Sequence, residues 1–318
     1  MMPNYKYIGE HQAQMLSLLK IFVNICHDHD IDYWLDGGSL LGLVRHDGNM
    51  IPWDDDIDIC VPIYDYRRLL SKLKQYSVEN GNTYLYYDSS NYISWSEYFC
   101  SSNYATLTGS GMMLPIKIDI LPVKGIDVNE LEVDLKRVKD VAYFKTNVDK
   151  VRYPFYKILS YNSLKKNFVN EMTYTLKNYD TYMDQHSDFV GDKYVIKGHG
   201  QYSPIKKIHS KYVFPLRTES FCGLKVKVPF DHQMYLVQSY GDNYLDLPPK
   251  EKQKSVNVFL TKINADYLKY LNKCKDDYYL HGFTSRFLPF GLKLAFNALK
   301  TKNMKILKII IIDRLTRS

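Results

Sequence analysis

The sequence predicts an α+β fold in which a mixed sheet is flanked by helices. Segments with apolar residues three and four positions apart, typical of helices, occur between short segments in which apolar and polar residues alternate, typical of strands. The chain has no internal repeat and no low-complexity linker, and its 318 residues can bury a sizeable core. We therefore expect one large domain over residues 1–283 and a basic amphipathic tail over residues 284–318.

The first part of the chain is expected to begin with a helix over residues 10–29, where apolar residues share one face. A short strand over residues 33–35 then leads into a tight turn, Asp-Gly-Gly-Ser, at residues 36–39. A second helix begins with the apolar run from residue 40, and residues 65–76 have the pattern of a third. This order places a glycine-rich turn between the end of a strand and the start of a helix.

Two segments alternate acidic and apolar residues and are expected to be strands. Residues 56–61 read Asp-Ile-Asp-Ile-Cys-Val, so Asp56 and Asp58 would lie on the same wet face. Residues 116–122 alternate in the same way and place Asp119 in mid-strand between apolar neighbours. A second strand therefore offers a third carboxylate.

The rest of the chain is expected to contain helices over residues 128–143 and 164–183. A β-rich module over residues 213–229 follows, and then a helix over residues 231–240 that ends at Gly241. These last elements would form a β and helical appendage to the sheet.

Cysteine usage and apolar segments indicate the compartment. The five cysteines are odd in number and scattered, with no CxxC pair, so we expect reduced thiols. The first residues lack the basic segment and apolar run of a signal peptide, and no stretch reaches the roughly 18 apolar residues of a spanning helix. We therefore expect a cytoplasmic protein.

The net charge of +7 suits nucleic acid, anionic lipid or a polyphosphate-bearing substrate, and charge alone does not choose among them. In residues 284–318, basic residues are interleaved with Phe, Leu and Ile, which is the composition of an interfacial amphipathic helix. Such a tail would hold the protein on the inner face of a membrane. The alternative is a helix that packs on the domain as a cap.

An acidic run is the strongest chemical feature of the sequence and comprises Asp54, Asp55, Asp56 and Asp58. Two carboxylates at alternate positions of a strand lie roughly 7 Å apart on one face, a span that a divalent cation can bridge. Phosphoryl transfer uses carboxylates to hold one or two Mg²⁺ ions, because hard cations prefer oxygen ligands. Adjacent carboxylates also repel one another unless a cation compensates them. The run is therefore a candidate metal site.

The glycine-rich turn suggests a phosphate site beside the acids. Glycine lets a phosphate approach the backbone, and the N–H groups at the start of a helix favour an anion. Further along the same helix, an arginine and a histidine add a fixed cation and a titratable ring that could hold a pyrophosphate or protonate a leaving group. The candidate substrate-binding residues are Gly37, Gly38, Ser39, Arg45 and His46.

Each feature also has a purely structural explanation. The acidic run could be a solvated loop, the two glycines a plain turn, and His46 a surface histidine. Arg45 could pair with Asp47 on the surface, and Asp119 could be a buried structural partner. Their occurrence together favours the functional explanation.

The same residues resemble a known family. Residues 33–48, Tyr-Trp-Leu-Asp-Gly-Gly-Ser-Leu-Leu-Gly-Leu-Val-Arg-His-Asp-Gly, with residues 51–59, Ile-Pro-Trp-Asp-Asp-Asp-Ile-Asp-Ile, closely resemble the signature of the LicD family. Residues 117–122 resemble its third-acid strand, and residues 240–252 contain two parts that resemble its C-terminal signature. The family includes bacterial phosphocholine transferases, and fukutin and fukutin-related protein are similar. The resemblance implies a nucleotidyltransferase-like fold.

The activity that this resemblance implies is transfer of a phospho-alcohol from a CDP-linked donor to a hydroxyl of a glycan or lipid-linked glycan, with release of CMP. The alcohol could be choline, glycerol, ribitol or another, and the product would serve capsule, teichoic acid or lipopolysaccharide biosynthesis. Nucleic acid is not an expected partner.

The resemblance also implies roles for individual residues. Asp56 and Asp58 would bind Mg²⁺, with Mn²⁺ as an alternative ion, and Asp54 would assist. Asp119 would complete the metal site or act as a base, so that Asp56, Asp58 and Asp119 are the expected catalytic residues. One departure is visible, because residues 253–259 lack a histidine that many relatives carry. This puts any acceptor role of that position in doubt.

Three other functions share parts of the pattern. A nucleotidyltransferase would leave the nucleoside monophosphate on its acceptor, whereas the expected phosphotransferase releases CMP. A sugar transferase could use an Asp-x-Asp metal motif, but the Gly-Gly-Ser turn upstream of the acids disfavours it. A non-catalytic glycan-binding relative would not need the complete set of acids found here.

Overall fold

A computed structural model of the chain describes residues 5–81, 83–86, 96–100, 104–107, 113–130, 181, 188–197, 208–255 and 260–262. Seven strands of the described part form a mixed sheet: β1 (Trp34–Leu35), β2 (Asp58–Pro62), β3 (Thr83–Tyr86), β4 (Ser96–Cys100), β7 (Lys117–Asp127), β8 (Lys193–Lys197) and β9 (Ile208–His209). Five of them follow the order β1-β2-β7-β4-β3, and β8 and β9 extend the sheet beside the second half of β7. The strands β2 and β7 are parallel, and the other neighbours are antiparallel.

In the part of the chain that the structure describes, two smaller sheets accompany the central one. The hairpin of β10 (Arg217–Phe221) and β11 (Leu224–Val228) is antiparallel, and β11 also lies close to β1. A three-stranded sheet has the order β12-β5-β6 and consists of β5 (Tyr104–Leu107), β6 (Met113–Pro115) and β12 (Leu260–Lys262).

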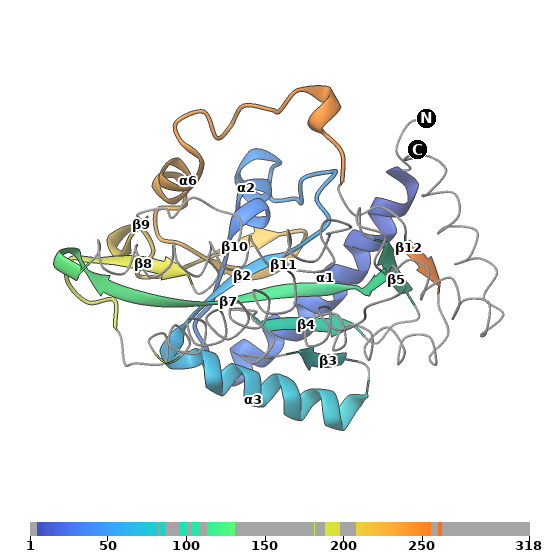
Figure 1. Cartoon of the computed structure of the whole chain (residues 1–318), viewed down its shortest axis with the longest axis horizontal. Coiled ribbons are helices and arrows are strands. Elements are labelled where there is room, and N and C mark those ends of the chain that lie inside the picture. The colour runs from blue at the N-terminus through green and yellow to red at the C-terminus, as the bar shows by residue number, and fades with distance from the viewer. Residues whose placement is uncertain are drawn as a thin grey trace, which may run out of the picture.

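Helices flank the central sheet, as the sequence predicts. Figure 1 shows α2 and α6 above the sheet, α3 below it, and α1 crossing obliquely. The helices within the described residues are α1 (Tyr5–Asp28), α2 (Gly37–Arg45), α3 (Ile63–Asn80) and α6 (His232–Tyr240), with 3₁₀ turns η2 (Val128–Glu130), η3 (Ser210–Tyr212) and η4 (Lys250–Lys252). The α2 and α6 helices pack against each other on the same side. The expected mixed sheet with flanking helices is confirmed.

The helices form where the apolar spacing predicts them. On α1, Met15, Leu19 and Phe22 are fully buried, which places one face of the helix in the core. The α3 helix ends at Gly81, whose φ of +67° favours glycine and whose N–H donates to the carbonyl oxygen of Ser77. The helix α6 also ends at a glycine: it begins after Asp231 and ends at Gly241.

The helix α2 begins three residues earlier than the sequence predicts. Gly37 and Gly38 do not form a separate turn; they are the first two residues of the helix. Asp36 joins strand and helix directly, because its N–H donates to the carbonyl oxygen of Asp58 at 3.0 Å and its own carbonyl accepts from the N–H of Leu40 at 3.0 Å. The start of α2 is therefore fixed against the start of β2.

Three other expectations differ from the structure or fall outside it. The strand predicted over residues 56–61 begins at Asp58, so Asp56 lies in the preceding loop. Residues 213–215 are not a strand, because Val213 closes the 3₁₀ turn η3 by donating its N–H to Ser210. The helix predicted over 128–143 is described only in η2; almost all of 164–183 and the whole tail 284–318 lie outside the described residues.

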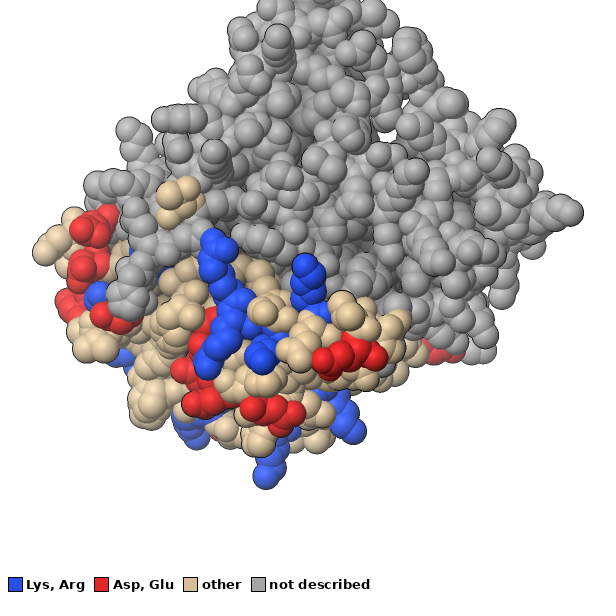
Figure 2. Space-filling view, turned by 90° about the horizontal axis from the view of Figure 1, so that it is seen from below, with Lys and Arg blue, Asp and Glu red and all other residues tan. Residues whose placement is uncertain are grey.

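The surface beneath the sheet carries both signs of charge. Figure 2 views this face, and the described acidic and basic side chains lie among one another there. Exposed residues of α3 include Arg67, Arg68, Lys74 and Glu79, and Arg68 pairs with Asp65 at 2.5 Å. Among the helices of the described residues, none is long and apolar enough to cross a membrane.

Candidate active site

The central parallel pair of strands brings the predicted acids together. Asp58 is the first residue of β2, and its register partner on β7 is Asp119. The backbone N–H of Asp119 donates to the carbonyl oxygen of Ile57 at 2.9 Å, which ties the two strands at this point. Asp54, Asp55 and Asp56 lie in the loop that leads into β2. The loop of residues 54–56, which we call the acid loop, therefore lies next to the point where Asp58 on β2 and Asp119 on β7 pair.

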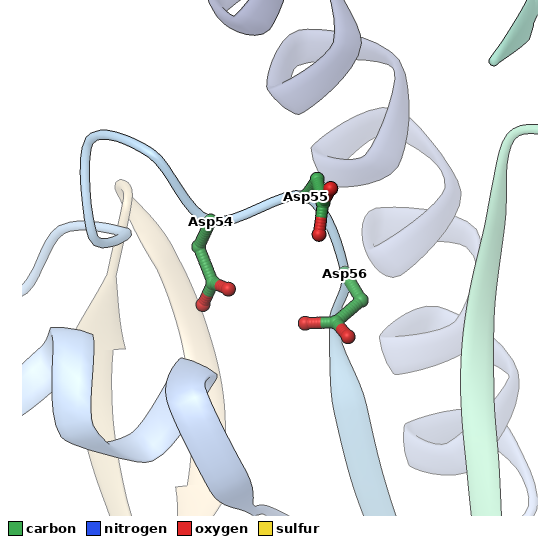
Figure 3. Close-up of side chains that lie close together, drawn as sticks. All are labelled: Asp54, Asp55 and Asp56. Atoms are coloured by element: carbon green, nitrogen blue, oxygen red, sulfur yellow. The ribbon is translucent and has the colours of Figure 1, made fainter. Parts of the chain in front are cut away.

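Within the acid loop, three carboxylates converge. Asp54, Asp55 and Asp56 each offer an oxygen, and these oxygens lie within 4.8 Å of one another. In Figure 3, the carboxylates of Asp54 and Asp56 turn toward the space between them. Among the described residues, Asp58 and Asp119 are close by but lie outside this tight group. The convergent set thus includes Asp55, which belongs to the predicted acidic run but to which the family resemblance assigned no metal-binding role.

The electrostatics of the acid loop are unfavourable without a cation. Burial raises the pKa of Asp54, and the neighbouring charges of Asp56 and Asp55 raise it further. Burial also raises the pKa of Asp56, followed by the charges of Asp119 and Asp55. Oδ2 of Asp54 is enclosed without a hydrogen-bond partner in the described part of the chain. Such carboxylates suit a hard divalent cation, which accepts oxygen ligands and compensates their charge.

These pKa shifts lead to a pH prediction for the metal-free protein. Raised carboxyl pKa values mean that the folded state binds protons more tightly than the unfolded state. The free energy of unfolding of the metal-free protein should therefore increase as the pH falls from about 8 to about 5. Chemical denaturation at several pH values, with wild-type protein and Asp54→Asn compared at each, isolates the contribution of this site.

The slope against pH should be shallower in Asp54→Asn, because that variant cannot take up the proton. Added Mg²⁺ should stabilise the wild-type protein more at the higher pH, because protons and the cation compete for the same oxygens. Identical slopes for the two proteins would contradict the assignment.

The two glycines at the start of α2 leave room for the acids. A Cβ atom on Gly37 would lie 2.5 Å from Oδ2 of Asp58, and Gly37 also has a φ of +54°. A Cβ atom on Gly38 would meet Oδ2 of Asp54. The carboxylates of Asp54 and Asp58 therefore pack directly against the first turn of α2, whose partial positive charge favours them.

Ser39, Arg45 and His46 take different positions on the same helix. Ser39 is buried, and its Oγ accepts from the backbone N–H of Asp58 at 3.4 Å. The Nη1 atom of Arg45 donates to the carbonyl oxygens of Asp246 at 3.1 Å and Tyr244 at 3.5 Å. Ser39 thus joins α2 to β2, and Arg45 joins α2 to the segment after α6. Their contacts with a donor remain a prediction.

His46 lies at the end of α2 beside Trp53, with the two rings edge to face and their centroids 6.0 Å apart. Burial lowers the pKa of His46, and the nearby Arg45 lowers it further. Its Nδ1 is enclosed with no partner among the residues that the structure describes. A neutral ring next to the acid loop is compatible with the predicted substrate contact but does not test it.

Several residues of the site were not predicted from the sequence. His11 and Gln12 on α1 hold the acid loop: Nε2 of His11 hydrogen-bonds the carbonyl oxygen of Asp55 at 2.8 Å, and Nε2 of Gln12 donates to that of Asp54 at 2.9 Å. Lys117 pairs with both carboxylate oxygens of Asp119, at 2.5 and 2.6 Å. Of these three residues, only Lys117 could have been predicted from the sequence. It lies two positions before Asp119, and residues two apart on a strand share a face.

A buried hydrogen-bonded chain supports Asp36 from α6. Nε1 of Trp34 donates to the hydroxyl of Tyr235 at 3.2 Å, and this hydroxyl donates to Oδ1 of Asp36 at 2.7 Å. Burial raises the pKa of Tyr235, and the charge of Asp36 adds to it. The residue before α2 is therefore fixed by a helix about 200 positions away in the sequence.

Tyr240, at the end of the same helix, also faces the acids. Burial is the largest cause of its raised pKa, although 47% of the surface of this residue is exposed. The charges of Asp36, Asp58 and Asp54 raise the pKa further, which places the phenol within their electrostatic reach.

Comparison with known proteins places this site in a family. The family model described as LicD/FKTN/FKRP, nucleotidyltransferase domain, matches residues 30–133, which include the acid loop, both glycines and Asp119. The lipopolysaccharide cholinephosphotransferase LicD of Haemophilus influenzae is 27% identical over 261 residues, or 79% of this chain and 96% of that protein.

Two shorter matches fall in the same comparison. An uncharacterized protein of Rickettsia prowazekii is 36% identical over 72 residues, which is 23% of this chain and 27% of that protein. The ribitol 5-phosphate transferase FKRP of Homo sapiens is 46% identical over 43 residues, which is 14% of this chain and 8% of that protein. The resemblance predicted from the sequence is thus confirmed, and residues 30–133 of this chain are a domain of the LicD family.

Proposed function

We propose that this protein is a LicD-like phosphotransferase that moves a phospho-alcohol from a CDP-linked donor to a hydroxyl of a glycan and releases CMP. The observation that carries the proposal is the half-buried group of three carboxylates in the acid loop, of which Asp54 packs against the first turn of α2, inside the matched domain. The named relatives support the reaction class, since one is a cholinephosphotransferase and another a ribitol 5-phosphate transferase. Their alcohols differ, so the donor's alcohol stays open.

Asp54 and Asp56, with Asp58 and Asp119 beside them, would hold Mg²⁺, or Mn²⁺ as an alternative. Bound there, the cation would neutralise charge on the phosphate oxygens of the donor. The proposed metal dependence is supported by the raised pKa values in the acid loop and by the enclosed Oδ2 of Asp54. Asp55 is not assigned to the cation, because its carboxylate accepts a hydrogen bond from Ser255.

The rest of the reaction falls to side chains and backbone groups. The N–H groups at the start of α2 would bind the donor's phosphates, with Arg45 and His46 farther along the helix. The acceptor hydroxyl oxygen would form a bond to the phosphorus that bears the alcohol, while the bond from that phosphorus to the CMP oxygen breaks. As the alternative to a metal-binding role, Asp119 would act as the base that takes the hydroxyl proton, with its carboxylate held in place by Lys117.

The test is to incubate the protein with Mg²⁺ and a panel of CDP-alcohols, with and without candidate glycans, and to follow CMP. Release of CMP that depends on both alcohol and glycan is the expected result. CMP covalently attached to the acceptor would instead identify a nucleotidyltransferase. Glycan binding without any turnover of the panel would support a non-catalytic relative.

A second part of the proposal concerns the acceptor's location. We propose that the tail of residues 284–318 rests on the cytoplasmic face of a membrane and brings the active site to a lipid-linked glycan. Basic residues near an anionic surface contribute about 1 kcal/mol each, so the eight lysines and arginines of the tail would bind reversibly. The composition of the tail supports this proposal, and its structure lies outside the described residues.

Sedimentation with anionic vesicles checks the tail. The full-length protein is expected to sediment with them and not with neutral vesicles, whereas a chain that ends at His281 should stay in solution. Equal binding by both proteins, or by neither, contradicts the membrane role. Unfolding of the shortened chain would support the alternative that the tail caps the domain.

A further inference from the structure

The segment after α6 returns to the acid loop. Residues 241–255, called the strap below, run from Gly241 over α2 to η4 and end at Ser255 (Figure 1). Hydrogen bonds connect the strap to α2 and to the acid loop. Arg45 on α2 binds the carbonyl oxygens of Tyr244 and Asp246, and the hydroxyl of Ser255 donates to Oδ2 of Asp55 at 2.5 Å.

The contact at Asp55 joins the strap to the acid loop, next to the proposed ligands Asp54 and Asp56. Asp55 stands between Asp54 and Asp56, whose carboxylates point into the space between them (Figure 3). The backbone carbonyl oxygen of Asp55 is also held, by His11 on α1 at 2.8 Å. Fixing Asp55 at both its backbone and its carboxylate therefore fixes the backbone directions from which its two neighbours project.

The hydrogen bond also distinguishes the three carboxylates. A hydroxyl that donates to an ionised carboxylate makes a short and strong bond, and this one joins residues 200 positions apart. Oδ2 of Asp55 is engaged with the strap, whereas Oδ2 of Asp54 is enclosed without a partner in the described structure. Asp55 is thus suited to be an anchor, and Asp54 and Asp56 are suited to be ligands.

We propose that Ser255 is a positioning residue, which acts through Asp55 to close the strap on the acid loop and to hold Asp54 and Asp56 in place for a divalent cation. The proposal rests on the proposed function for the identity of the site. It does not rest on turnover, because strap closure and cation binding can each be measured without a substrate.

The strap carries its own reporter of closure. Lys250, Lys252 and Lys254 are exposed and provide trypsin sites between the contacts with α2 and with Asp55. If the bond from Ser255 to Asp55 holds the strap, its loss should raise the rate of cleavage at these lysines roughly tenfold or more, because a hydrogen bond to a charged group is among the stronger ones. Mass spectrometry assigns each cleavage to its lysine.

The experiment compares full-length wild-type protein with Ser255→Ala, Ser255→Thr and Ser17→Ala. Ser255→Ala is expected to be cleaved faster and to need a severalfold higher Mg²⁺ concentration for half of its thermal shift. Ser255→Thr keeps the hydroxyl and should behave more like wild type. Ser17→Ala removes a serine hydroxyl from the exposed side of α1 and should change neither quantity.

Coupling to Asp55 is tested by adding Asp55→Ala to Ser255→Ala. The double variant should lose little more Mg²⁺ affinity than Asp55→Ala alone, because both changes remove the same bond. The proposal is overturned if Ser255→Ala matches wild type in both cleavage and Mg²⁺ response, or if the two losses simply add. Failure of the CDP-alcohol panel would overturn the proposed function and leave this result standing.

Discussion

Replacing Asp56 with asparagine is expected to lower turnover by roughly 100-fold or more while leaving the protein folded. The change removes one convergent carboxylate of the acid loop and keeps the size of the side chain. Burial and the charges of Asp119 and Asp55 raise the pKa of Asp56, so a neutral amide relieves repulsion in the metal-free state. The melting temperature without metal should therefore hold or rise.

The measurement pairs CMP release with thermal unfolding in the presence and absence of Mg²⁺. In Asp56→Asn, the rise in melting temperature on adding Mg²⁺ should shrink, because the cation has lost a ligand. Asp28→Asn makes the same chemical change on an exposed residue at the end of α1 and should leave both quantities at the wild-type value. Wild-type turnover in Asp56→Asn would remove this residue from the site.

The elements of the fold that build the site could largely be predicted from local patterns. Apolar spacing predicted α1 and α3, because a helix that buries one face must repeat about every 3.6 residues. The helix α6 was predicted with its end at Gly241. Alternation predicted the strand that carries Asp119 and most of β2. It failed at Asp56, where the acid and apolar residues still alternate although the chain has not yet entered the sheet. The alternation of polar and apolar residues indicates which face of the chain is exposed to solvent. It does not indicate which residues pair with a neighbouring strand.

The partners of the acids could not be predicted in this way. Ser255 meets Asp55, and Tyr235 meets Asp36, across separations of 200 and 199 residues, and neither serine nor tyrosine at those positions has a spacing that points to an aspartate. Such contacts depend on how the strap and α6 return to α2, which is a property of the tertiary structure. The two adjacent glycines are visible in the sequence, but the close approach of the carboxylates to α2 that requires them is not.

This close approach leads to the second prediction with a large effect. Gly37→Ala is expected to lower both stability and turnover, because two separate features oppose a side chain at this position. The φ of +54° lies in the left-handed region, and the new Cβ would lie 2.5 Å from Oδ2 of Asp58. Either α2 or the Asp58 carboxylate must move, and we expect turnover to fall by roughly 100-fold, since small displacements of reacting groups cost about this much.

Substitutions at two further glycines distinguish the effect of the positive φ from the effect of the contact with a carboxylate. Gly81 has a φ of +67°, and a Cβ atom there would meet nothing within 4 Å, so Gly81→Ala should cost about 1 kcal/mol of unfolding free energy and leave turnover unchanged. Gly38 does not have a positive φ, but its Cβ would meet Asp54, so Gly38→Ala should reduce turnover and Mg²⁺ binding. Chemical denaturation and CMP release are measured for all three variants. If Gly37→Ala and Gly81→Ala keep equal turnover, the contact between α2 and the acids has no part in the reaction; if Gly37→Ala alone combines both losses, the glycines serve to let the carboxylates reach the helix.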